Sequence, residues 1–415
     1  MSHTNWEWYY LKDLSSISIS NGVFNDPKNV GLGYRLINVV DLYTEPSIDV
    51  SKLKQLNITE KDFKKYNVIK GDIFFTRSSL KLEGIAHCNI FDSDENDVIF
   101  ECHIMRIRPI VTRINPKFMR LYCISQLARK YFMKHSKTTT MTTIDQDVLG
   151  RLLVPVPPIE EQDSIVNIFA KCNRSIELTQ SLIKTKQERR KWLMQQLLTG
   201  KRRMPKFKKS KDLRKTPFGT LPADWGYPRI GDVAKEVSER NGNESARSVL
   251  SCTKHQGLVD SLTYFGKRIF SEDLSNYKIV RRGQFAYATN HIDEGSIGYQ
   301  GSYDEALIRP IYTVFQTNDT MDELFLFLIL KTETYRHIFA SNTSASVDRR
   351  GSLRWNDFAK IHVPHPSIEE QQAIVNIIET ADRELELLRS QLDALKEQKK
   401  GLMQQLLTGK LRVKM

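Results

Sequence analysis

The chain has 415 residues, of which 27% are charged and 40% hydrophobic, and its formal net charge is +13. This length allows two to four domains with separate cores, and the longest wholly apolar run, Leu324 to Leu330, is far shorter than the ~20 residues that cross a bilayer. A membrane protein is therefore excluded, and because Met1 to Asn5 open no apolar signal segment, we expect a cytoplasmic protein.

The first 153 residues are predicted to form one α/β domain. Short β-rich runs at Ile73 to Phe75 and Cys102 to Arg108 precede an amphipathic helix from about Pro116 to His135. His103 lies in the second run, where we expect a satisfied sheet residue rather than a metal ligand. Arg106 and Arg108 share one face of that run, so they either line a groove or face water.

The next 48 residues, Val154 to Lys201, return without a gap at Val363 to Lys410, and 26 of the 48 aligned positions are identical. In the first copy, two prolines precede Glu160, and Gly200 is a natural left-handed cap at the end. We predict a helix of about 40 residues, or ~60 Å, within domain boundaries of 154–201. A seam repeats every seven residues: Ile165, Phe169, Cys172, Ile176, Thr179, Ile183, Lys186, Arg190, Leu193 and Leu197.

A basic stretch follows this helix. Residues 201–215 hold nine lysines and arginines against Asp212, so this stretch carries +8 of the net +13. A solvated linker and a direct phosphate contact are about equally favoured for it.

The second globular segment, predicted over residues 202–362 together with the linker, shares a skeleton with the first. Val68 to Ile73 is echoed by Val280 to Phe285, and Trp6 by Trp225. A β-rich run at Ile311 to Phe315 again precedes an amphipathic helix, here from Met321 to Ala340. The two domains therefore have one ancestor but different surfaces.

The second long helix is predicted within 363–415, with Ser367 and Glu370 in capping-box spacing and Gly409 as the terminal cap. The two helices most simply pair antiparallel. The second seam is more apolar than the first: Ile374, Ile378, Ala381, Leu385, Leu388, Leu392, Leu395, Lys399, Leu402 and Leu406.

Positions outside the seam are also identical in the two copies, which packing between the two helices does not require. We predict that they bind a duplicated partner. They are Glu160, Glu161, Gln162, Gln195 and Gln196 in the first copy, and Glu369, Glu370, Gln371, Gln404 and Gln405 in the second. Trp192, which stands where the second copy has Gly401, is also expected to contact a partner protein, with stacking on a base as the alternative.

Five cysteines are scattered along the chain and form no C-x-x-C pair. Neither a disulfide framework nor a zinc site is supported, and we expect no metal site in the chain. Reduced thiols are expected at Cys88, Cys102, Cys123, Cys172 and Cys252.

The repeated helix ending in Leu-Leu-Thr-Gly-Lys, the segment Phe218 to Trp225 and the two unlike domains resemble the specificity subunit of a type I restriction-modification system. The resemblance covers the whole chain. It implies an α+β fold class, in which two α/β target recognition domains are joined by two long antiparallel coiled-coil helices as a pseudo-two-fold internal repeat.

In that family the subunit is not catalytic. The resemblance implies that each recognition domain reads one half of a bipartite, asymmetric site in double-stranded DNA, while the helices set the gap and dock two methyltransferase subunits. Motor-nuclease subunits join through the complex. No cofactor is then expected in this chain, since S-adenosylmethionine, ATP and Mg would belong to the partner subunits.

Candidate DNA contacts are polar side chains on loops beside predicted strands, because base edges need donors and acceptors, and phosphates need cations or hydroxyls. In the first domain they are Thr76, Arg77, Ser78, Ser79, Lys81, Lys137, Thr138, Thr139, Thr140, Thr142 and Thr143. In the second they are Lys254, His255, Gln256, Tyr287, Thr289, Asn290, His291, Arg349, Arg350, Ser352 and Arg354.

Two other classes of function stay open. The chain could be a structural adaptor that assembles a complex without reading sequence, or a stand-alone nuclease or methylase. Against the second, the sequence has no G-x-x-x-x-G-K-[ST] phosphate loop and no Asn-Pro-Pro or Asp-Pro-Pro tetrapeptide, so we expect no turnover from this chain alone.

Overall fold

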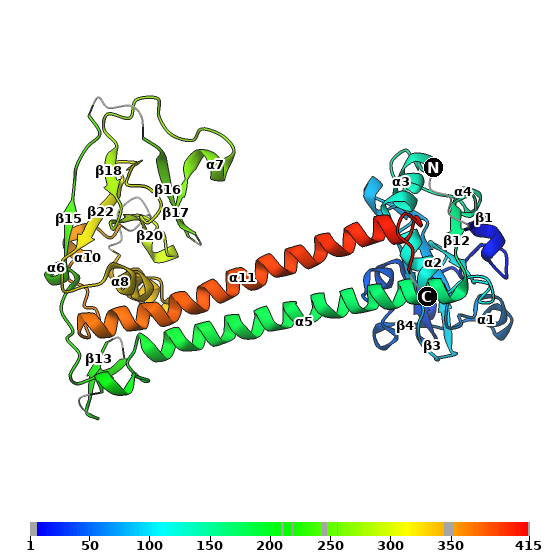
Figure 1. Cartoon of the computed structure of the whole chain (residues 1–415), viewed down its shortest axis with the longest axis horizontal. Helices are drawn as coiled ribbons and strands as arrows, with labels where there is room; N and C mark the ends of the chain where they lie inside the picture. The colour runs from blue at the N-terminus through cyan, green and yellow to red at the C-terminus, as the bar shows by residue number, and fades with distance from the viewer. Residues whose placement is uncertain are drawn as a thin grey trace. The chain divides into compact units, whose positions relative to one another are not determined.

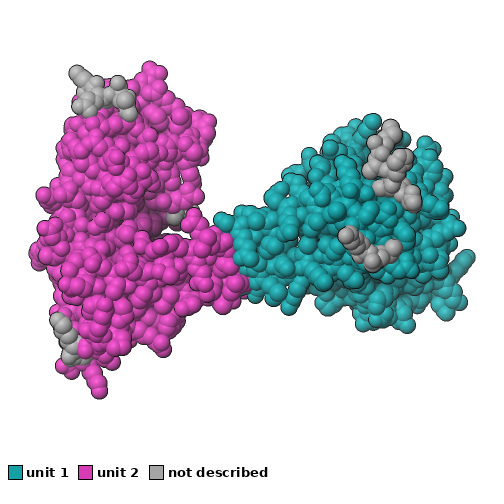
Figure 2. Space-filling model, in the orientation of Figure 1, with its two compact units in different colours: residues 1–181, 390–415 teal, residues 182–389 magenta. Residues whose placement is uncertain are grey.

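A computed structural model describes residues 6–208, 211–217, 219–242, 247–254, 256–343 and 352–413. The chain forms two compact units, shown in different colours in Figure 2. Unit 1 comprises residues 1–181 and 390–415, and unit 2 comprises residues 182–389. Each unit thus holds one globular domain together with part of each long helix. Within the described residues, no helix combines the length and apolar character needed to span a membrane.

Unit 1 is built on two small sheets. One has the strand order β2-β9-β5-β7 and the other the order β4-β3-β8, in which β3 and β8 run parallel. Smaller sheets are β1-β12 and β10-β11-β6. The strands are β1 (Glu7–Tyr10), β2 (Ser20–Asn21), β3 (Val30–Ile37), β4 (Lys54–Leu56), β5 (Ile73–Thr76), β6 (Ser78–Ser79), β7 (Cys88–Ile90), β8 (Val98–Phe100), β9 (Ile104–Ile107), β10 (Lys137–Thr138), β11 (Thr142–Thr143) and β12 (Leu153–Val156).

Unit 2 repeats this plan. Its sheets have the orders β15-β22-β19-β20 and β17-β16-β21-β18, and the parallel pair is β16 with β21. A two-stranded sheet, β13-β14, lies in the linker. The strands are β13 (Leu213–Thr216), β14 (Gly219–Pro222), β15 (Ala234–Val237), β16 (Val249–Thr253), β17 (Gly257–Asp260), β18 (Lys278–Arg281), β19 (Phe285–Ala288), β20 (Ile297–Tyr299), β21 (Glu305–Ile308) and β22 (Tyr312–Thr317).

The shared skeleton predicted from the sequence is confirmed at the turn that enters the central strand of each unit. Gly71 and Gly283 have φ angles of 96° and 85°, a region that glycine adopts without steric cost. One residue later, the side chain of Asp72 accepts a hydrogen bond from the Ile69 backbone N–H at 3.1 Å. Gln284 does the same for Arg281 at 2.8 Å. The same type of turn therefore precedes β5 and β19.

The single amphipathic helix predicted in each domain is wrong, because each is broken into two. In unit 1 the break falls before Ser125, whose side chain caps the second helix by accepting from the Ala128 N–H at 3.4 Å. Thr332 caps its counterpart in unit 2. A hydroxyl that satisfies the free N–H groups of a new helix start favours a break at that point. The four helices are α2 (Pro116–Cys123), α3 (Gln126–His135), α8 (Glu323–Leu330) and α9 (Glu333–Asn342).

Shorter helices complete both units. The short α-helices are α1 (Glu60–Tyr66), α4 (Gln146–Gly150), α6 (Ile230–Val233), α7 (Ser261–Phe265) and α10 (Trp355–Phe358). The 3₁₀ turns are η1 (Leu11–Leu14), η2 (Pro27–Asn29), η3 (Val39–Tyr43), η4 (Val50–Lys52), η5 (Leu82–Gly84), η6 (Pro205–Phe207) and η7 (Ile292–Glu294).

The two long helices are α5 (Ile159–Leu197) and α11 (Ile368–Leu406), which lie side by side within each unit (Figure 1). All twenty predicted seam positions are buried or half-buried, as the seven-residue spacing requires. In unit 1, Ile165 and Phe169 share a core cluster with Leu406, and in unit 2, Leu197 shares one with Ile374. The helices therefore pair antiparallel, as predicted.

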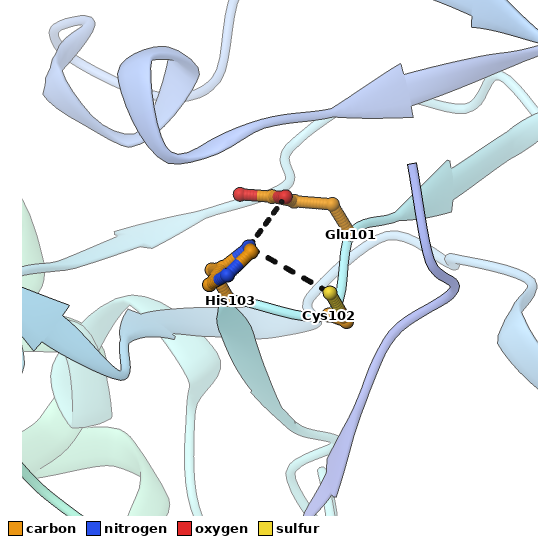
Figure 3. Close-up of side chains that lie close together, drawn as sticks. All are labelled: Glu101, Cys102 and His103. Carbon is orange, nitrogen blue, oxygen red and sulfur yellow. Dashed lines mark hydrogen bonds and ion pairs between the residues drawn. The ribbon is translucent and has the colours of Figure 1, made fainter. Parts of the chain in front are cut away.

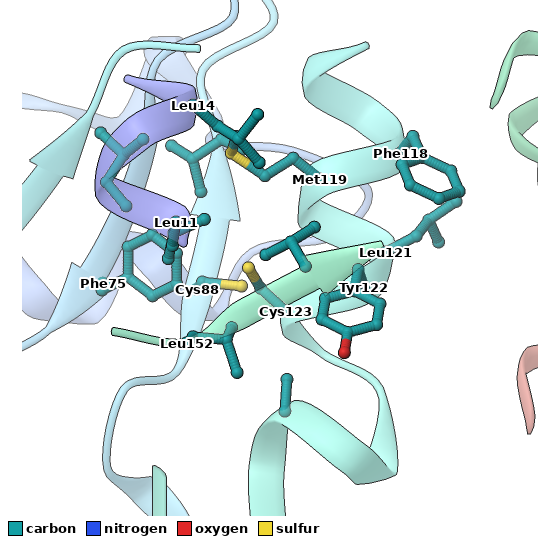
Figure 4. Packing of buried hydrophobic residues seen from close by; sticks show 14 of the residues in the cluster. Leu11, Leu14, Phe75, Cys88, Phe118, Met119, Leu121, Tyr122, Cys123 and Leu152 are labelled. Atoms are coloured by element: carbon teal, nitrogen blue, oxygen red, sulfur yellow. The ribbon is translucent and has the colours of Figure 1, made fainter. Parts of the chain in front are cut away.

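The main core of unit 1 lies between β5, β7 and the helices α2 and α3. Figure 4 shows the sulfur atoms of Cys88 and Cys123 facing one another among Leu11, Phe75 and Leu152. Complete burial raises the pKa of the Cys123 thiol well above its usual value, so the thiol stays protonated. All five cysteines are free, which agrees with the prediction of reduced thiols.

Candidate nucleic-acid interface

The structure brings the two candidate segments of the first domain into one small sheet. β11 pairs with β6 in a register that places Thr142 opposite Ser79 and Thr143 opposite Ser78. β10 pairs with the other edge of β11, with Lys137 opposite Thr143. Segments about sixty residues apart thus form a single polar surface, which we call the β6–β11–β10 sheet.

Most candidate side chains on this sheet reach solvent. Ser78 and Ser79 are half-buried, and seven further candidates are exposed and include the cations that a phosphate would need. The exposed set is Arg77, Lys81, Lys137, Thr138, Thr139, Thr140 and Thr143. Their contact with DNA stays a prediction.

Two candidates in the first domain need correction, because the structure leaves them almost no exposed surface. Thr76 is 0% exposed, and its hydroxyl donates to the Gly84 carbonyl at 3.1 Å and accepts from the His87 N–H at 2.9 Å. Thr142 is 2% exposed and shares a hydrogen bond with the Thr138 hydroxyl at 3.2 Å. Thr76 therefore fastens the end of β5 to the segment before β7, and Thr142 links β11 to β10.

The second domain places its candidates on the same framework. Thr289 and Asn290, which follow β19, are half-buried, and His291 is exposed. The Leu353 N–H donates to the Thr289 carbonyl at 2.8 Å, which sets Ser352 and Arg354 beside this segment. Ser352 is half-buried and Arg354 is exposed.

The same backbone bond occurs in unit 1, where the Ile144 N–H donates to the Arg77 carbonyl at 3.0 Å. Arg77 follows β5 as Thr289 follows β19, so the two candidate surfaces are equivalent positions of one fold.

Tyr287 is corrected as a DNA contact. It is 0% exposed, and its ring stacks on Phe358 with the centroids 4.7 Å apart. Burial raises the pKa of its hydroxyl. The strand β19 turns this side chain into the core, which a count of polar residues after a strand cannot reveal.

The remaining candidates of the second domain lie elsewhere or outside the described residues. Lys254 and Gln256 are exposed at the turn between β16 and β17. His255, Arg349 and Arg350 lie outside the described residues.

Arg106 is buried and Arg108 is half-buried, so neither side chain simply faces water. Arg108 makes two hydrogen bonds of 2.8 Å to the buried carboxylate of Asp72. Arg106 is 4% exposed and donates to the Asn67 carbonyl at 2.5 Å, and burial lowers its pKa to about 10. Arg106 is therefore part of the unit 1 interior, and Arg108 lies at its edge.

The largest departure from the sequence predictions concerns Glu161. This residue is 1% exposed, and its carboxylate accepts hydrogen bonds from the Trp6 indole N–H at 3.1 Å and from two nitrogens of Arg412 at 2.7 Å. Trp6 begins the first domain, and Arg412 follows α11. Burial by itself raises the pKa of Glu161. The hydrogen bonds from Arg412 and Trp6 lower the pKa by more than burial raises it, so the net pKa lies below its ordinary value.

Glu370 in unit 2 has the same surroundings. It is 2% exposed and accepts from the Trp225 indole N–H at 3.1 Å and from two nitrogens of Arg203 at 2.8 Å. Arg203 follows α5, as Arg412 follows α11. We call these groups the Glu161 cluster and the Glu370 cluster.

The neighbouring glutamines are duplicated in the same way. Gln162 is 0% exposed and accepts from the Asn115 N–H at 2.7 Å while it donates to the Pro157 carbonyl at 2.7 Å. Gln371, also 0% exposed, accepts from the Asp322 N–H at 2.8 Å and donates to the Pro366 carbonyl at 2.9 Å. Each glutamine ties a long helix to its domain.

The identity of these positions therefore has a reason inside the chain. Packing between the two helices does not require Glu161, Gln162, Glu370 and Gln371, but the attachment of each helix to its domain does, and these four buried side chains are corrected as partner contacts. The exposed members of the predicted set stay predictions: Glu160, Gln195, Glu369, Gln404 and Gln405, together with the half-buried Gln196.

Sequence reasoning missed the arginines that complete these clusters. Arg203 was counted among the cations of the linker, where it makes ion pairs with Glu370 and Asp224. Arg214 donates to the Trp225 carbonyl at 2.7 Å. The repeat offered a way to find Arg203 and Arg412, since each lies three residues after the glycine of a Thr-Gly-Lys motif, Gly200 or Gly409.

One group of potential metal ligands occurs within the described residues. Glu101, Cys102 and His103 offer atoms that all lie within 4.8 Å of one another, and Figure 3 shows His103 between the other two. His103 lies in a turn between β8 and β9 and is exposed, so its predicted place in a strand is wrong. Glu101 already pairs with His103 at 3.1 Å and accepts from the Val39 N–H at 3.3 Å. The absence of a metal site stays a prediction.

Comparison with known proteins gives a consistent result. The family described as type I restriction modification DNA specificity domain matches residues 3–186 and 222–397. The chain is 24% identical to the type I restriction enzyme MjaX specificity subunit of Methanocaldococcus jannaschii, over 99% of this chain and 94% of that protein. It is 26% identical to the MjaVIII specificity subunit of the same organism, over 71% of this chain and 70% of that protein.

Solved structures share the fold. The HsdS subunit from Thermoanaerobacter tengcongensis has a TM-score of 0.57 and 16% identity, over 99% of this chain and 98% of that chain. The type I restriction-modification S subunit from M. genitalium has a TM-score of 0.51 and 14% identity, over 100% and 98% of the two chains. The predicted fold class is thus confirmed.

Proposed function

Because this chain belongs to the type I restriction-modification DNA specificity family, we propose that each of its two domains reads one half of a bipartite, asymmetric DNA site. The observation that supports this is one framework with two sets of side chains. The same backbone bond holds Arg77 to Ile144 and Thr289 to Leu353. The residues that follow each strand differ, being Arg-Ser-Ser in the first domain and Thr-Asn-His in the second. Two domains with the same backbone framework but different hydrogen-bond donors and acceptors are suited to reading two different half-sites.

The paired helices then set the gap between half-sites and dock two methyltransferase subunits. One observation supports the docking. The polar residues of the helix ends that stay exposed, such as Gln195 and Gln404, occur in both copies. Duplicated surfaces of this kind can bind two copies of one partner about a pseudo-two-fold axis. S-adenosylmethionine, ATP and Mg would act in the methyltransferase and motor-nuclease partners.

The adaptor alternative predicts binding without sequence preference. Mapping methylated bases in the genome of the source cell gives the recognised site, and duplexes with that site and with random sequence can then be compared across salt concentrations. A specific reader should favour its own site by roughly 10³-fold or more. Equal affinity for both duplexes would support the adaptor instead. Purified chain assayed without partners should neither cleave nor methylate DNA.

The role of the helices is tested by insertion. Seven residues added after Ser181 and seven before Ser390 lengthen each helix by about 10 Å and keep both seams in register. We expect a site with both halves unchanged and a gap about three base pairs longer. Insertion of four residues in each helix, about 6 Å, should lengthen the gap by about two. Variants that methylate a site with the original gap would contradict the proposal.

A further inference from the structure

Three exposed apolar side chains lie at one end of the β6–β11–β10 sheet. Leu80, directly after β6, is 84% exposed, and Leu82 and Met141 are 41% and 38% exposed. The ladder pairs Thr142 with Ser79, so the next step of the same register places Met141 opposite Leu80. We call Leu80, Leu82 and Met141 the apolar tip.

The loop that carries Leu80 is held in place. The Lys81 N–H donates to the Ser79 hydroxyl at 3.2 Å, and the Gly84 N–H donates to the Lys81 carbonyl at 3.0 Å. Arg129, from α3, donates to the Glu83 carbonyl at 2.8 Å and to the Ile85 carbonyl. Leu80 is therefore presented to solvent by a fixed loop, at little further cost in conformational entropy on binding.

Cations lie on both sides of the apolar tip along this short sheet. Lys81 is exposed directly after Leu80, and Arg77 and Lys137 are exposed at the other end of the two-residue ladder. Among the described residues, the one carboxylate paired with these cations is Asp145, at 3.9 Å from the Lys137 ammonium. An apolar projection among cations matches duplex DNA, whose phosphates are anionic and whose stacked bases offer apolar faces. Proteins that bend DNA insert leucine, methionine and similar side chains between base pairs in this way.

We propose that Leu80, supported by Met141, inserts between two neighbouring base pairs of the half-site that the first domain reads, and partly unstacks them. This rests on the proposed function and adds a distortion of the DNA to it. Among the described residues, the second domain offers no counterpart to Leu80. Thr289 corresponds to Arg77, so Leu80 corresponds to Ile292, which is 0% exposed. We therefore expect distortion of one half-site only.

The test uses the full chain in complex with its methyltransferase subunits and duplexes with 2-aminopurine placed at successive positions of both half-sites. Unstacking raises the fluorescence of this base. At positions other than the methylated base, which a methyltransferase flips out of the stack, we expect a rise at one step of one half-site. Leu80→Ala should abolish the rise and weaken binding to the selected site about tenfold to hundredfold, which is what burial of a leucine contributes. The matched control is Leu32→Ala, because Leu32 on β3 is 74% exposed. This variant should change neither the fluorescence rise nor the affinity for the selected site.

A wild-type complex that prefers its own site but gives no rise, or a rise that persists in Leu80→Ala, overturns the insertion and leaves the proposed function intact. Loss of the Leu80→Ala effect when thymines are replaced by uracil also overturns it, since Leu80 would then contact a thymine methyl group. A wild-type complex without preference for any site refutes the proposed function itself. Equal amide exchange in wild type and Leu80→Ala shows that both are folded.

Discussion

At the scale of single residues, the buried carboxylates Glu161 and Glu370 join the helices to the domains. Each carboxylate is almost inaccessible and accepts bonds from an indole and an arginine that lie far away in the sequence. A buried charge is tolerated only when it is paired and hydrogen-bonded, and the removal of one partner costs more than the pair contributes.

We predict that Glu161→Gln destabilises unit 1 by about 2 kcal/mol, because the charge-assisted hydrogen bonds from Arg412 are lost, while Arg412 itself is partly exposed and can be solvated. Glu160→Gln is the matched control, since Glu160 is the exposed neighbour on the same helix, and should cost less than about 0.5 kcal/mol. Amide exchange measured by mass spectrometry checks both. Residues 6–14 and 409–413 should exchange about thirtyfold faster in Glu161→Gln. Equal exchange in the two variants would show that the cluster is not a stabilising element.

The depressed pKa of Glu161 makes this contribution depend on pH. Its ordinary value is 4.5 and its folded value is lower, so the stabilisation is complete above about pH 4.5 and is lost as the pH falls through the folded value. The difference in unfolding free energy between wild type and Glu161→Gln should therefore be constant near neutral pH and shrink below pH 4.5. Urea unfolding at a series of pH values measures it. A difference that stays the same down to about pH 3 would contradict the assignment.

At the scale of elements, the seven-residue seam decides which helix faces are covered. Seam positions of α5 become polar in the middle, where Lys186 pairs with Glu384 and Arg190 with Asp382. Both pairs lie within unit 2 and join α5 to α11. Opposite charges at these positions fit one antiparallel register, since a shift by one turn would separate them.

Two leucines of α11 test the seam directly. Leu385 occupies a seam position and is 4% exposed, whereas Leu387 is 71% exposed. Leu385→Ala should destabilise unit 2 by about 2–4 kcal/mol, because it leaves a cavity between the helices, and Leu387→Ala should cost less than about 0.5 kcal/mol. Thermal unfolding followed by circular dichroism compares them. Similar losses in both variants would mean that the seam is not the packed face.

At the scale of the whole molecule, the duplication gives two domains with the same fold and different surface residues. If each domain reads its own half-site, Arg77→Ala should lower the discrimination between correct and wrong bases by about 1–3 kcal/mol in the half-site of the first domain. Arg354→Ala should have the same effect only in the half-site of the second domain. Selection of bound duplexes from a randomised pool, followed by sequencing, reports both halves at once. A loss of discrimination in both halves from one substitution would contradict independent reading.

Much of the architecture could be predicted because it depends on local patterns. The repeat, the seam spacing and the terminal glycines specify helices α5 and α11 through interactions between residues three to seven apart. The turn at Gly71 and Gly283 is equally local. The breaks before Ser125 and Thr332 could also have been found, because both residues are good helix caps at the point where the long amphipathic pattern divides.

The amino-acid sequence by itself determined that this protein is two related domains with two matching helices, because periodicity and duplication survive in the order of residues. Only the tertiary structure decided which polar residues face solvent. Thr76 and Tyr287 are buried because the strands β5 and β19 are covered on both faces, and Glu161 and Glu370 are buried because partners from distant segments reach them. Burial of a polar group depends on contacts across the fold, and no short stretch of sequence contains them.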